Sequence, residues 1–496
     1  MTPAPVQVEI DSGRLRGRIS AGVIRFDGIP YAAPPLGTLR FAAPQPALPW
    51  GGVRNADQSP PGPLQLPGQT LGSRPVAATS EDCLHINVVT PGIKGQRAVL
   101  VWIYGGGFIN GASADPIHAG ERLAARGDVV LVTFDYRLGA FGFLHTEAGS
   151  NPGMRDQLAA LQWVQRNIGA FGGDPRRVTV FGESAGAMCL LTLMGAPTAD
   201  SLFRAGIAQS GAASGISDRE TAAKTHAAMA DELGSTDVHT WRKLPHDRLL
   251  AAQQVVGQRI RSSTGRGAFR PMLDGDLIVA DGQSAQSREV NRDRPLIVGS
   301  NGDEQRLFLV LRRRLDRPTA LARLGRALSS LCSEPAEAAA RLLDGYARLL
   351  PDARESERLA AAETELYYRR PLLALAALRE QQHATTWNYL FNWPSPALRG
   401  RLGACHALEI PFVFGTLDAP GMASFAGNGA AAWRVSEQMM DAWAAFAQEG
   451  HPQAAVAAWA PWSSVHHWAW IIGQAPGVES DPRAAERRLW ADVLGS

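Results

Sequence analysis

The sequence predicts an α/β fold with a large, mostly parallel central sheet, helices on both of its faces and helical insertions. Four uninterrupted apolar runs indicate strands buried on both faces, as in parallel sheets; they cover residues 98–104, 129–134, 178–181 and 296–298. Helical patterns separate these runs, and an alternation of strands and helices is typical of a doubly wound sheet.

The N-terminal part of the chain predicts further strands. Residues 6–10 alternate between apolar and polar side chains, and a turn sequence follows at 11–13. We expect short strands at 15–19 and 23–26. Residues 34–72 are rich in proline and glycine, which predicts a mostly ordered loop.

Three later segments predict helices. Apolar residues recur at helical spacing over 154–168, and the glycines between 169 and 173 end that helix. Residues 310–383 are rich in alanine, leucine and arginine and lie between two strands, which predicts a helical insertion or cap over the sheet. A last helix is expected over 431–449. Because no low-complexity linker divides the sequence, we expect one domain over residues 1–496.

The composition excludes two classes of protein. Of the 496 residues 45% are hydrophobic, and 49 Lys and Arg against 47 Asp and Glu give a net charge of +2. A protein built to bind nucleic acid would carry a basic excess, and a disordered chain would hold fewer apolar residues. We therefore expect a folded protein with no nucleic-acid partner.

The cysteines and the N-terminus bear on location. No CxxC pair occurs, which disfavours a zinc ribbon, and the cysteines are too widely spaced for a disulfide scaffold; they are Cys83, Cys189, Cys332 and Cys405. The N-terminus lacks the basic and apolar regions of a signal peptide, and no apolar run is long enough to span a membrane. These observations predict reduced thiols and a cytoplasmic location.

The strongest local motif predicts a nucleophilic serine. Residues 182–186, Gly-Glu-Ser-Ala-Gly, fit the pattern G-x-S-x-G, with a strand before them and an apolar helical stretch at 187–194 after them. A serine on a sharp strand-to-helix turn holds a strained backbone, and the flanking glycines leave room for it. The alternative is a glycine-rich turn with an idle serine. The context favours Ser184 as a nucleophile.

A serine hydroxyl needs a base, and His406 is the leading candidate. In hydrolases with this motif the triad order is Ser, acid, His, so only histidines after Ser184 qualify. His406 follows a loop of small residues and precedes the apolar stretch 410–414, an arrangement that brings an imidazole to the sheet edge. The alternatives are His383, His466 and His467, and His406 itself could be a satisfied structural histidine.

The acid should follow a strand. Asp303 and Glu304 come shortly after the strand at 296–298, and either carboxylate could orient the imidazole. Either could instead be a solvated loop charge or a helix N-cap. The residues alone do not choose between them.

Three glycines predict an oxyanion hole. Gly105, Gly106 and Gly107 directly follow the strand at 98–104, and their N–H groups could stabilise an oxyanion together with that of Ala185. A phosphate-binding loop is the rival interpretation, but a Walker lysine is absent and G-x-G-x-x-G is not matched. A tight βα turn is the structural alternative.

The ordered motifs resemble the type-B carboxylesterase family, which includes bacterial carboxylesterases and cholinesterases. The matching segments run through most of the chain; they are 26–32, 39–41, 81–84, 104–108, 136–139, 171–175, 181–186, 209–211 and 403–415. The resemblance implies an α/β-hydrolase fold. It also implies site residues, namely the triad Ser184, Glu304 and His406, the oxyanion donors Gly106, Gly107 and Ala185, and the ion pairs Arg40–Glu81 and Arg137–Asp156.

Four departures from the family pattern stand out. Cys83 is the first cysteine, so the disulfide that secreted relatives form with an upstream cysteine cannot exist here. The family's Asn before Tyr-Arg is Asp135, and the Gly that usually follows the triad acid is Gln305. Residues 51–80 contain no Trp, which argues against a choline ester as the preferred substrate.

We therefore predict a serine hydrolase that cleaves small-molecule carboxylic esters through an acyl-enzyme and needs no metal or organic cofactor. The alternative is an amide or carbamate hydrolase with the same triad. A non-catalytic adhesion protein is disfavoured, because such relatives lack the nucleophile. Glu183 could make the site electronegative or serve the structure alone. The sequence predicts neither the individual substrate nor the oligomeric state.

Overall fold

The computed structural model covers most of the chain. It describes residues 6–67, 78–212, 215–280, 293–312, 315–453 and 455–495.

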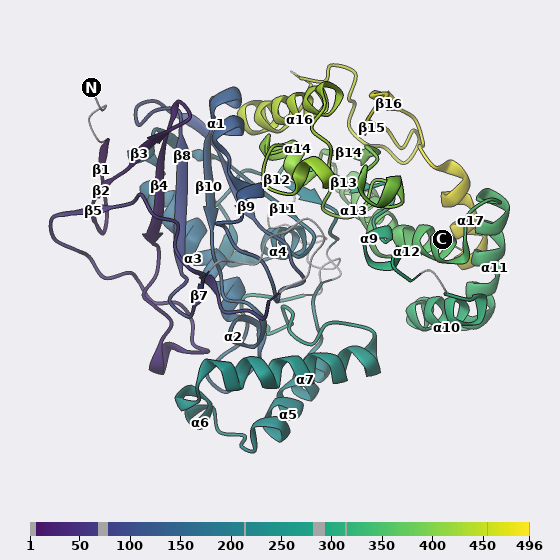
Figure 1. Cartoon of the computed structure of the whole chain (residues 1–496), viewed down its shortest axis with the longest axis horizontal. Coiled ribbons are helices and arrows are strands. Elements are labelled where there is room, and N and C mark those ends of the chain that lie inside the picture. Colours follow the sequence, from purple (N-terminus) through teal and green to yellow (C-terminus); the bar gives the residue numbers. More distant parts are fainter. Residues whose placement is uncertain are drawn as a thin grey trace.

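A central sheet of eleven strands organises the described part of the molecule (Figure 1). In spatial order its strands are β16 (Gly477–Glu479), β15 (Ala469–Ile472), β14 (Thr386–Phe391), β13 (Leu296–Asn301), β12 (Ala205–Gln209), β11 (Gly173–Glu183), β9 (Arg97–Ile103), β10 (Val130–Phe134), β8 (His85–Thr90), β4 (Val23–Pro30) and β3 (Arg18–Ser20). The seven strands from β15 to β10 are parallel, and the strands at both edges are antiparallel. The predicted α/β class with a mostly parallel sheet is confirmed.

The middle of the sheet forms because its strands are apolar on both faces. In β9, residues 98–103 are all at most 1% exposed. Val101 pairs in parallel with Val132 of β10 on one side and with Val180 of β11 on the other. Uninterrupted apolar runs of this kind bury both faces, which requires a layer of helices on each side.

Helices cover both faces of the sheet (Figure 1). On one side α1 (Glu121–Gly127) packs against α16 (Ala430–Glu449), so closely that a Cβ on Gly127 would lie 2.6 Å from the Ala444 Cβ. On the other side lie α3 (Pro152–Asn167) and α4 (Ala185–Met194), joined by a 3.2 Å contact from Gln157 Nε2 to Cys189 Sγ. The helices expected at 154–168, 187–194 and 431–449 are thus present, with small differences at their ends.

Two helical segments interrupt the alternation. Between β13 and β14 lie α9 (Arg306–Leu309), α10 (Arg317–Leu328), α11 (Pro335–Leu349), α12 (Glu355–Thr364), the π-helical turn η5 (Glu365–Arg369) and α13 (Arg370–Gln381). This is the insertion expected at 310–383. Its helices α10 to α12 share a separate apolar cluster with α17 (Ala484–Leu494), so they stand at the side of the sheet rather than over it (Figure 1).

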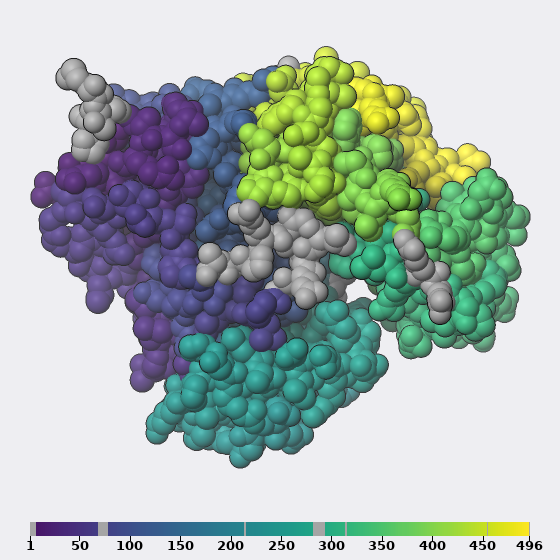
Figure 2. Space-filling view, in the orientation of Figure 1, coloured from purple at the N-terminus to yellow at the C-terminus, as the bar shows by residue number. Residues whose placement is uncertain are grey.

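The second segment was not predicted. Between β12 and β13 the chain forms α5 (Arg219–Leu233), α6 (Val238–Lys243) and α7 (His246–Thr264). These helices make the teal lobe at the bottom of Figure 2. The remaining short helices are α2 (Gly139–Phe143), α14 (Ile410–Phe414) and α15 (Met422–Phe425).

The N-terminal strands differ in one respect from the prediction. The strand expected at 15–19 is two strands, because β2 (Gly13–Arg16) joins a small sheet with β1 (Gln7–Ile10) and β5 (Val53–Asn55), while β3 joins the large sheet. Gly17 separates them, and a Cβ there would lie 2.6 Å from the Arg25 carbonyl oxygen. The region 34–72 is mostly loop as expected, apart from the 3-10 helix η1 (Gly37–Leu39), β5 and β6 (Gly62–Pro63), which pairs with β7 (Thr79–Ser80). Residues 68–72 lie outside the described part.

Two expectations about the whole chain have different outcomes. Within the described residues, no helix combines the length and apolar character needed to cross a lipid bilayer. The expectation of one domain over residues 1–496 stays a prediction.

Candidate active site

Ser184 lies on a strained turn between β11 and α4. Its backbone has φ 54° and ψ −119°, a conformation that costs energy for a residue with a side chain. The turn is tight, because a Cβ on Gly182 would lie 2.6 Å from the Gly186 carbonyl carbon and one on Gly186 would lie 1.9 Å from the Ile103 carbonyl oxygen. Both glycines of the motif are therefore required by packing, and Ser184 stands half-buried at the carboxyl end of the sheet.

His406 and Glu304 form a buried pair beside this turn. His406 Nδ1 lies 2.6 Å from Glu304 Oε2, and the side chains are 7% and 0% exposed. The second oxygen of Glu304 accepts a hydrogen bond of 2.7 Å from the Asn301 N–H at the end of β13. A backbone bond from the His406 N–H to the Glu304 carbonyl oxygen, 3.3 Å long, joins the two segments. The strand end thus fixes the carboxylate that holds the imidazole.

Asp303, the alternative acid, points elsewhere. Its Oδ1 lies 3.0 Å from Arg306 Nε, and its Oδ2 accepts a 3.0 Å hydrogen bond from the Ala404 N–H. Its side chain is 26% exposed. Asp303 therefore braces the loop that precedes His406 and does not contact the imidazole.

The other imidazole nitrogen faces Glu183. His406 Nε2 lies 3.0 Å from Glu183 Oε1, without the alignment of a hydrogen bond. In the described part of the chain no hydrogen bond joins the Ser184 hydroxyl to His406. Two of the three expected triad side chains, His406 and Glu304, are thus in direct contact. The third, Ser184, is the residue that follows Glu183 in the chain.

Three buried carboxylates surround His406. Sequence reasoning missed Glu409, which accepts hydrogen bonds from Asn301 Nδ2 (2.6 Å) and Gln209 Nε2 (3.2 Å) and is fully buried. The available signal was a carboxylate three residues after the candidate histidine, next to an apolar stretch. Glu409 links the end of β12 to the loop that carries His406.

These carboxylates shift the ionisation of the site. Burial lowers the pKa of His406, but the negative charges of Glu183, Glu304 and Glu409 outweigh it and raise that pKa to about 9. Burial, with the nearby Glu409 and Glu304, raises the pKa of Glu183 to about 8 against the opposing effect of His406. Burial and Glu304 raise the pKa of Glu409 to about 7. The site therefore favours a positively charged imidazole.

The glycine triplet lies against the nucleophile turn. A Cβ on Gly105 would lie 2.7 Å from the Glu183 carbonyl oxygen and 3.1 Å from the Ser184 Cβ, so only glycine allows this approach. Among the described residues, none accepts a hydrogen bond from the N–H groups of Gly106, Gly107 or Ala185. A Cβ on Gly107 would meet open space. These N–H groups are free to bind an oxyanion.

Two aromatic rings flank the imidazole. The ring centroids of Phe308 and Tyr368 lie 5.5 Å and 5.1 Å from that of His406. Phe308 is 50% exposed, whereas Tyr368 is buried on the π-helical turn η5. Phe308 therefore offers an apolar surface next to the site. No pattern in the sequence indicated that Tyr368 reaches it.

The ion pairs implied by the resemblance are present. Arg40 Nη2 lies 2.5 Å from Glu81 Oε1, and Arg137 Nη2 lies 2.6 Å from Asp156 Oδ1. Cys83 and the other three cysteines are free.

Comparisons with known proteins identify the family of the chain. The profile of the Carboxylesterase family matches residues 4–490. The para-nitrobenzyl esterase of Bacillus subtilis (strain 168) is 35% identical over 490 residues, which cover 96% of each chain. The fumonisin B1 esterase of Sphingopyxis macrogoltabida is 34% identical, over 91% of this chain and 85% of that relative.

Solved structures give the same result. A PNB esterase has a TM-score of 0.85 and 34% identity, covering 98% of this chain and all of the other (100%). A carboxylesterase of Geobacillus stearothermophilus, solved at pH 6.2, also has a TM-score of 0.85 and 34% identity, covering 98% and 99% of the two chains. The chain therefore belongs to the carboxylesterase family, as its motifs predicted, and is a carboxylic-ester hydrolase with the α/β-hydrolase fold.

Proposed function

We propose that the protein hydrolyses esters through Ser184, His406 and Glu304. Ser184 Oγ attacks the ester carbonyl while His406 Nε2 takes its proton, and Glu304 stabilises the imidazolium. The N–H groups of Gly106, Gly107 and Ala185 bind the tetrahedral oxyanion. His406 then protonates the leaving alcohol, and water releases the acid from the acyl-enzyme by the same steps.

One observation carries this proposal. In the neutral imidazole, the 2.6 Å contact between His406 Nδ1 and Glu304 Oε2 keeps the hydrogen on Nδ1, so that Nε2 can accept a proton. The strained turn at Ser184 beside the unpaired N–H groups supports the same assignment.

The proposal requires His406 to turn slightly toward Ser184. Nε2 lies 3.0 Å from Glu183 Oε1, and this contact lacks the alignment of a hydrogen bond. Catalytic hydrogen bonds often tighten only in the complex with substrate. We expect Nε2 to leave Glu183 for the Ser184 hydroxyl when an ester binds.

The substrate class follows from the family and from the apolar surface of Phe308. We propose small esters with an apolar group that packs on this exposed ring. An amide or carbamate would meet the same groups, and no contact in the described residues favours either over an ester.

A series of p-nitrophenyl esters with increasing acyl length tests the function. Wild type should hydrolyse at least part of the series, and Ser184→Ala should lose several orders of magnitude in kcat, as removal of a triad nucleophile does. A wild type that hydrolyses none of these esters, or a Ser184→Ala variant that keeps full activity, would contradict the proposal.

We also propose a cytoplasmic location. The four free thiols support it, because reduced cysteines persist in reducing compartments. Fractionation of the native cells, with activity and antibody detection in each fraction, tests this point; recovery outside the cytoplasm would contradict it.

A further inference from the structure

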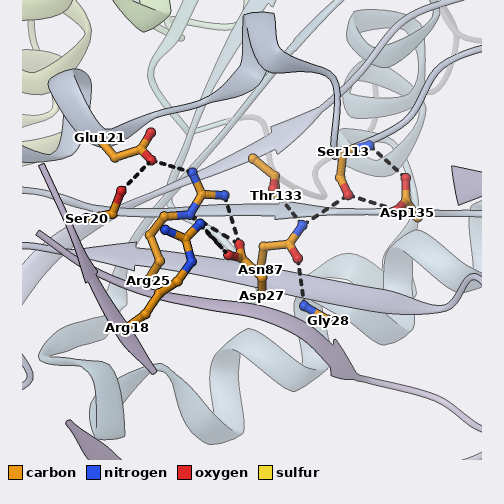
Figure 3. A network of polar contacts seen from close by, with 10 residues as sticks. All are labelled: Arg18, Ser20, Arg25, Asp27, Gly28, Asn87, Ser113, Glu121, Thr133 and Asp135. Atoms are coloured by element: carbon orange, nitrogen blue, oxygen red, sulfur yellow. Dashed lines mark hydrogen bonds and ion pairs between the residues drawn. The ribbon is translucent and has the colours of Figure 1, made fainter. Parts of the chain in front are cut away.

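Asp135 is a buried carboxylate whose position the proposed reaction does not explain. It follows β10 directly and is 0% exposed. None of the described arginines, lysines or histidines forms an ion pair with it. Its Oδ1 accepts a 2.7 Å hydrogen bond from the Ser113 N–H, and its Oδ2 accepts a 2.8 Å bond from the Ser113 hydroxyl (Figure 3). A buried charge without a cation is costly, so its retention calls for a function.

Asp135 and its neighbour hold both ends of one loop. This glycine loop, residues 104–113, begins at Tyr104, carries the triplet with Gly106 and Gly107, and ends at Ser113. At the far end Ser113 donates its two bonds to Asp135. At the near end the Tyr136 hydroxyl donates a 2.8 Å bond to the Tyr104 carbonyl oxygen. The two residues after β10 therefore set the path of the segment that supplies the oxyanion donors.

The direction of the hydrogen bonds fits a carboxylate. The Gly28 N–H donates to Asn87 Oδ1 (2.9 Å), so the Asn87 amide nitrogen must face Ser113, to whose Oγ it donates over 3.0 Å. The Ser113 hydroxyl must then direct its own hydrogen to Asp135 Oδ2. Figure 3 shows these contacts in sequence, from Gly28 through Asn87 and Ser113 to Asp135. The carboxylate thus accepts both hydrogens that Ser113 offers, which an ionised acid does without supplying a hydrogen of its own.

Four of the titratable groups that face Asp135 are neutral near pH 7. Burial raises the pKa of each of four facing groups above its ordinary value; they are Tyr31, Cys83, Tyr104 and Tyr136. Arg137, two residues after Asp135 in the chain, is paired with Asp156. Burial also raises the pKa of Asp135, to about 7, although hydrogen bonds from Ser113 and Tyr104 oppose the shift. Asp135 is thus the one of these groups that changes charge close to neutral pH.

We propose that Asp135 is a positioning residue whose ionised carboxylate holds the glycine loop in the geometry that binds the oxyanion, so that turnover depends on its ionisation. This inference rests on the proposed function, because it assigns the oxyanion donors to this loop. A carboxylate at this position distinguishes this chain, since the family's usual residue there is Asn.

The test compares kcat for a p-nitrophenyl ester in wild type and Asp135→Asn from pH 6 to pH 9. At pH 9 wild type should exceed the variant by about 10-fold, less than the 10²- to 10³-fold cost of losing a whole oxyanion donor. As the pH falls, the ratio should approach one, because wild type then also carries a neutral group at this position. His406 titrates in both proteins, so its effect cancels in the ratio.

Two further variants keep the test decisive. Ser113→Ala removes one donor from the carboxylate, which raises the pKa of Asp135, so the kcat ratio of wild type to Ser113→Ala should be larger between pH 7 and pH 8 than at pH 9. Ser113→Ala replaces Asp135→Asn in the test if circular dichroism shows Asp135→Asn to be unfolded. Thr133→Val is the matched control, because Thr133 accepts a 3.1 Å bond from Asn87 but does not contact the glycine loop; its profile should match wild type.

Each other outcome overturns the inference. Equal kcat values of wild type and Asp135→Asn at pH 9, or a ratio of the two that stays constant with pH, would show a structural role alone. A constant ratio of wild type to Ser113→Ala, or the same change in Thr133→Val, would show it too. If wild type hydrolyses no ester and Ser184 is not labelled by a fluorophosphonate, the proposed function falls and this inference with it. If wild type is active and labelled while Asp135→Asn behaves like wild type, only this inference falls.

Discussion

At the scale of single residues, the adjacent acids Asp303 and Glu304 have entirely different partners. Glu304 is buried against His406 Nδ1, whereas Asp303 pairs with Arg306 and the Ala404 N–H. Adjacent side chains at a turn point in different directions, so one carboxylate reaches the imidazole and its neighbour does not. The choice depends on a backbone turn, which composition and spacing do not encode.

Glu304→Gln should therefore lower kcat by roughly 10³- to 10⁴-fold, near the cost of replacing the triad aspartate of a serine protease by asparagine. The amide keeps the shape but loses the charge that stabilises the imidazolium. Asp303→Asn is the matched control and should cost far less, because a partly exposed loop ion pair contributes little. Steady-state kinetics under one assay, with circular dichroism for folding, decides; a crippled Asp303→Asn would make the assignment wrong.

Glu183 should set the pH dependence of the reaction. The base must be neutral, and the carboxylates raise the pKa of His406 to about 9, so the acid limb of kcat/KM should lie above the ordinary value of about 6.5. Glu183→Gln removes one negative charge 3.0 Å from Nε2, which lowers that pKa and should move the limb to lower pH. Asp303→Asn again serves as control. A limb that stays in place or moves upward would contradict the role of Glu183.

At the scale of elements, the strand–turn–helix unit around Ser184 was predictable because its constraints are local. An apolar strand, two glycines and an apolar helix follow one another in the sequence. The partners of this unit were less predictable. Glu409 binds Asn301, and Tyr368 packs on His406, from segments whose patterns show only an ordinary loop and helix. The helices α5 to α7 were missed for a similar reason, because their apolar stripe is weak among many polar residues.

Packing at the turn around Ser184 predicts that a side chain at position 186 destabilises the fold. In Gly186→Ala the added Cβ would meet the Ile103 carbonyl oxygen at 1.9 Å, a backbone atom that cannot move aside cheaply. The variant should lose about 3 kcal/mol of unfolding free energy or more, at the upper end of overpacking costs.

Gly169→Ala is the control for this prediction. A Cβ there meets nothing within 4 Å, so its effect should stay within about 0.5 kcal/mol. Urea denaturation measures both variants. Equal stabilities for Gly186→Ala and wild type would show that the turn tolerates a side chain.

At the scale of the whole molecule, the site makes the fold less stable at high pH. An Asp or Glu whose pKa is raised on folding binds more protons in the native state, so stability falls as the pH rises from the unfolded value, about 4.3 for Glu, through the folded one. Glu409, with a pKa of about 7, belongs to this class.

Glu409→Gln should therefore show a smaller fall in Tm between pH 5 and pH 8 than wild type. Its kcat should also fall, because the hydrogen bonds that Glu409 accepts from Asn301 and Gln209 change. Calorimetry across this pH range measures the difference. Glu357→Gln offers a control at a partly exposed site, since the hydrogen bond from Arg354 lowers the pKa of Glu357. A slope in Glu409→Gln equal to that of wild type would contradict the sign of the shift.

The proposed reaction depends first of all on Ser184 as the nucleophile. Its most direct test is peptide mapping by mass spectrometry after reaction with a fluorophosphonate, in wild type and in Ser184→Ala. We expect one modified residue in wild type, Ser184, and a loss of activity in proportion to labelling. The Ser184→Ala variant should carry no label. A label on another residue, or full activity after Ser184 is modified, would contradict it.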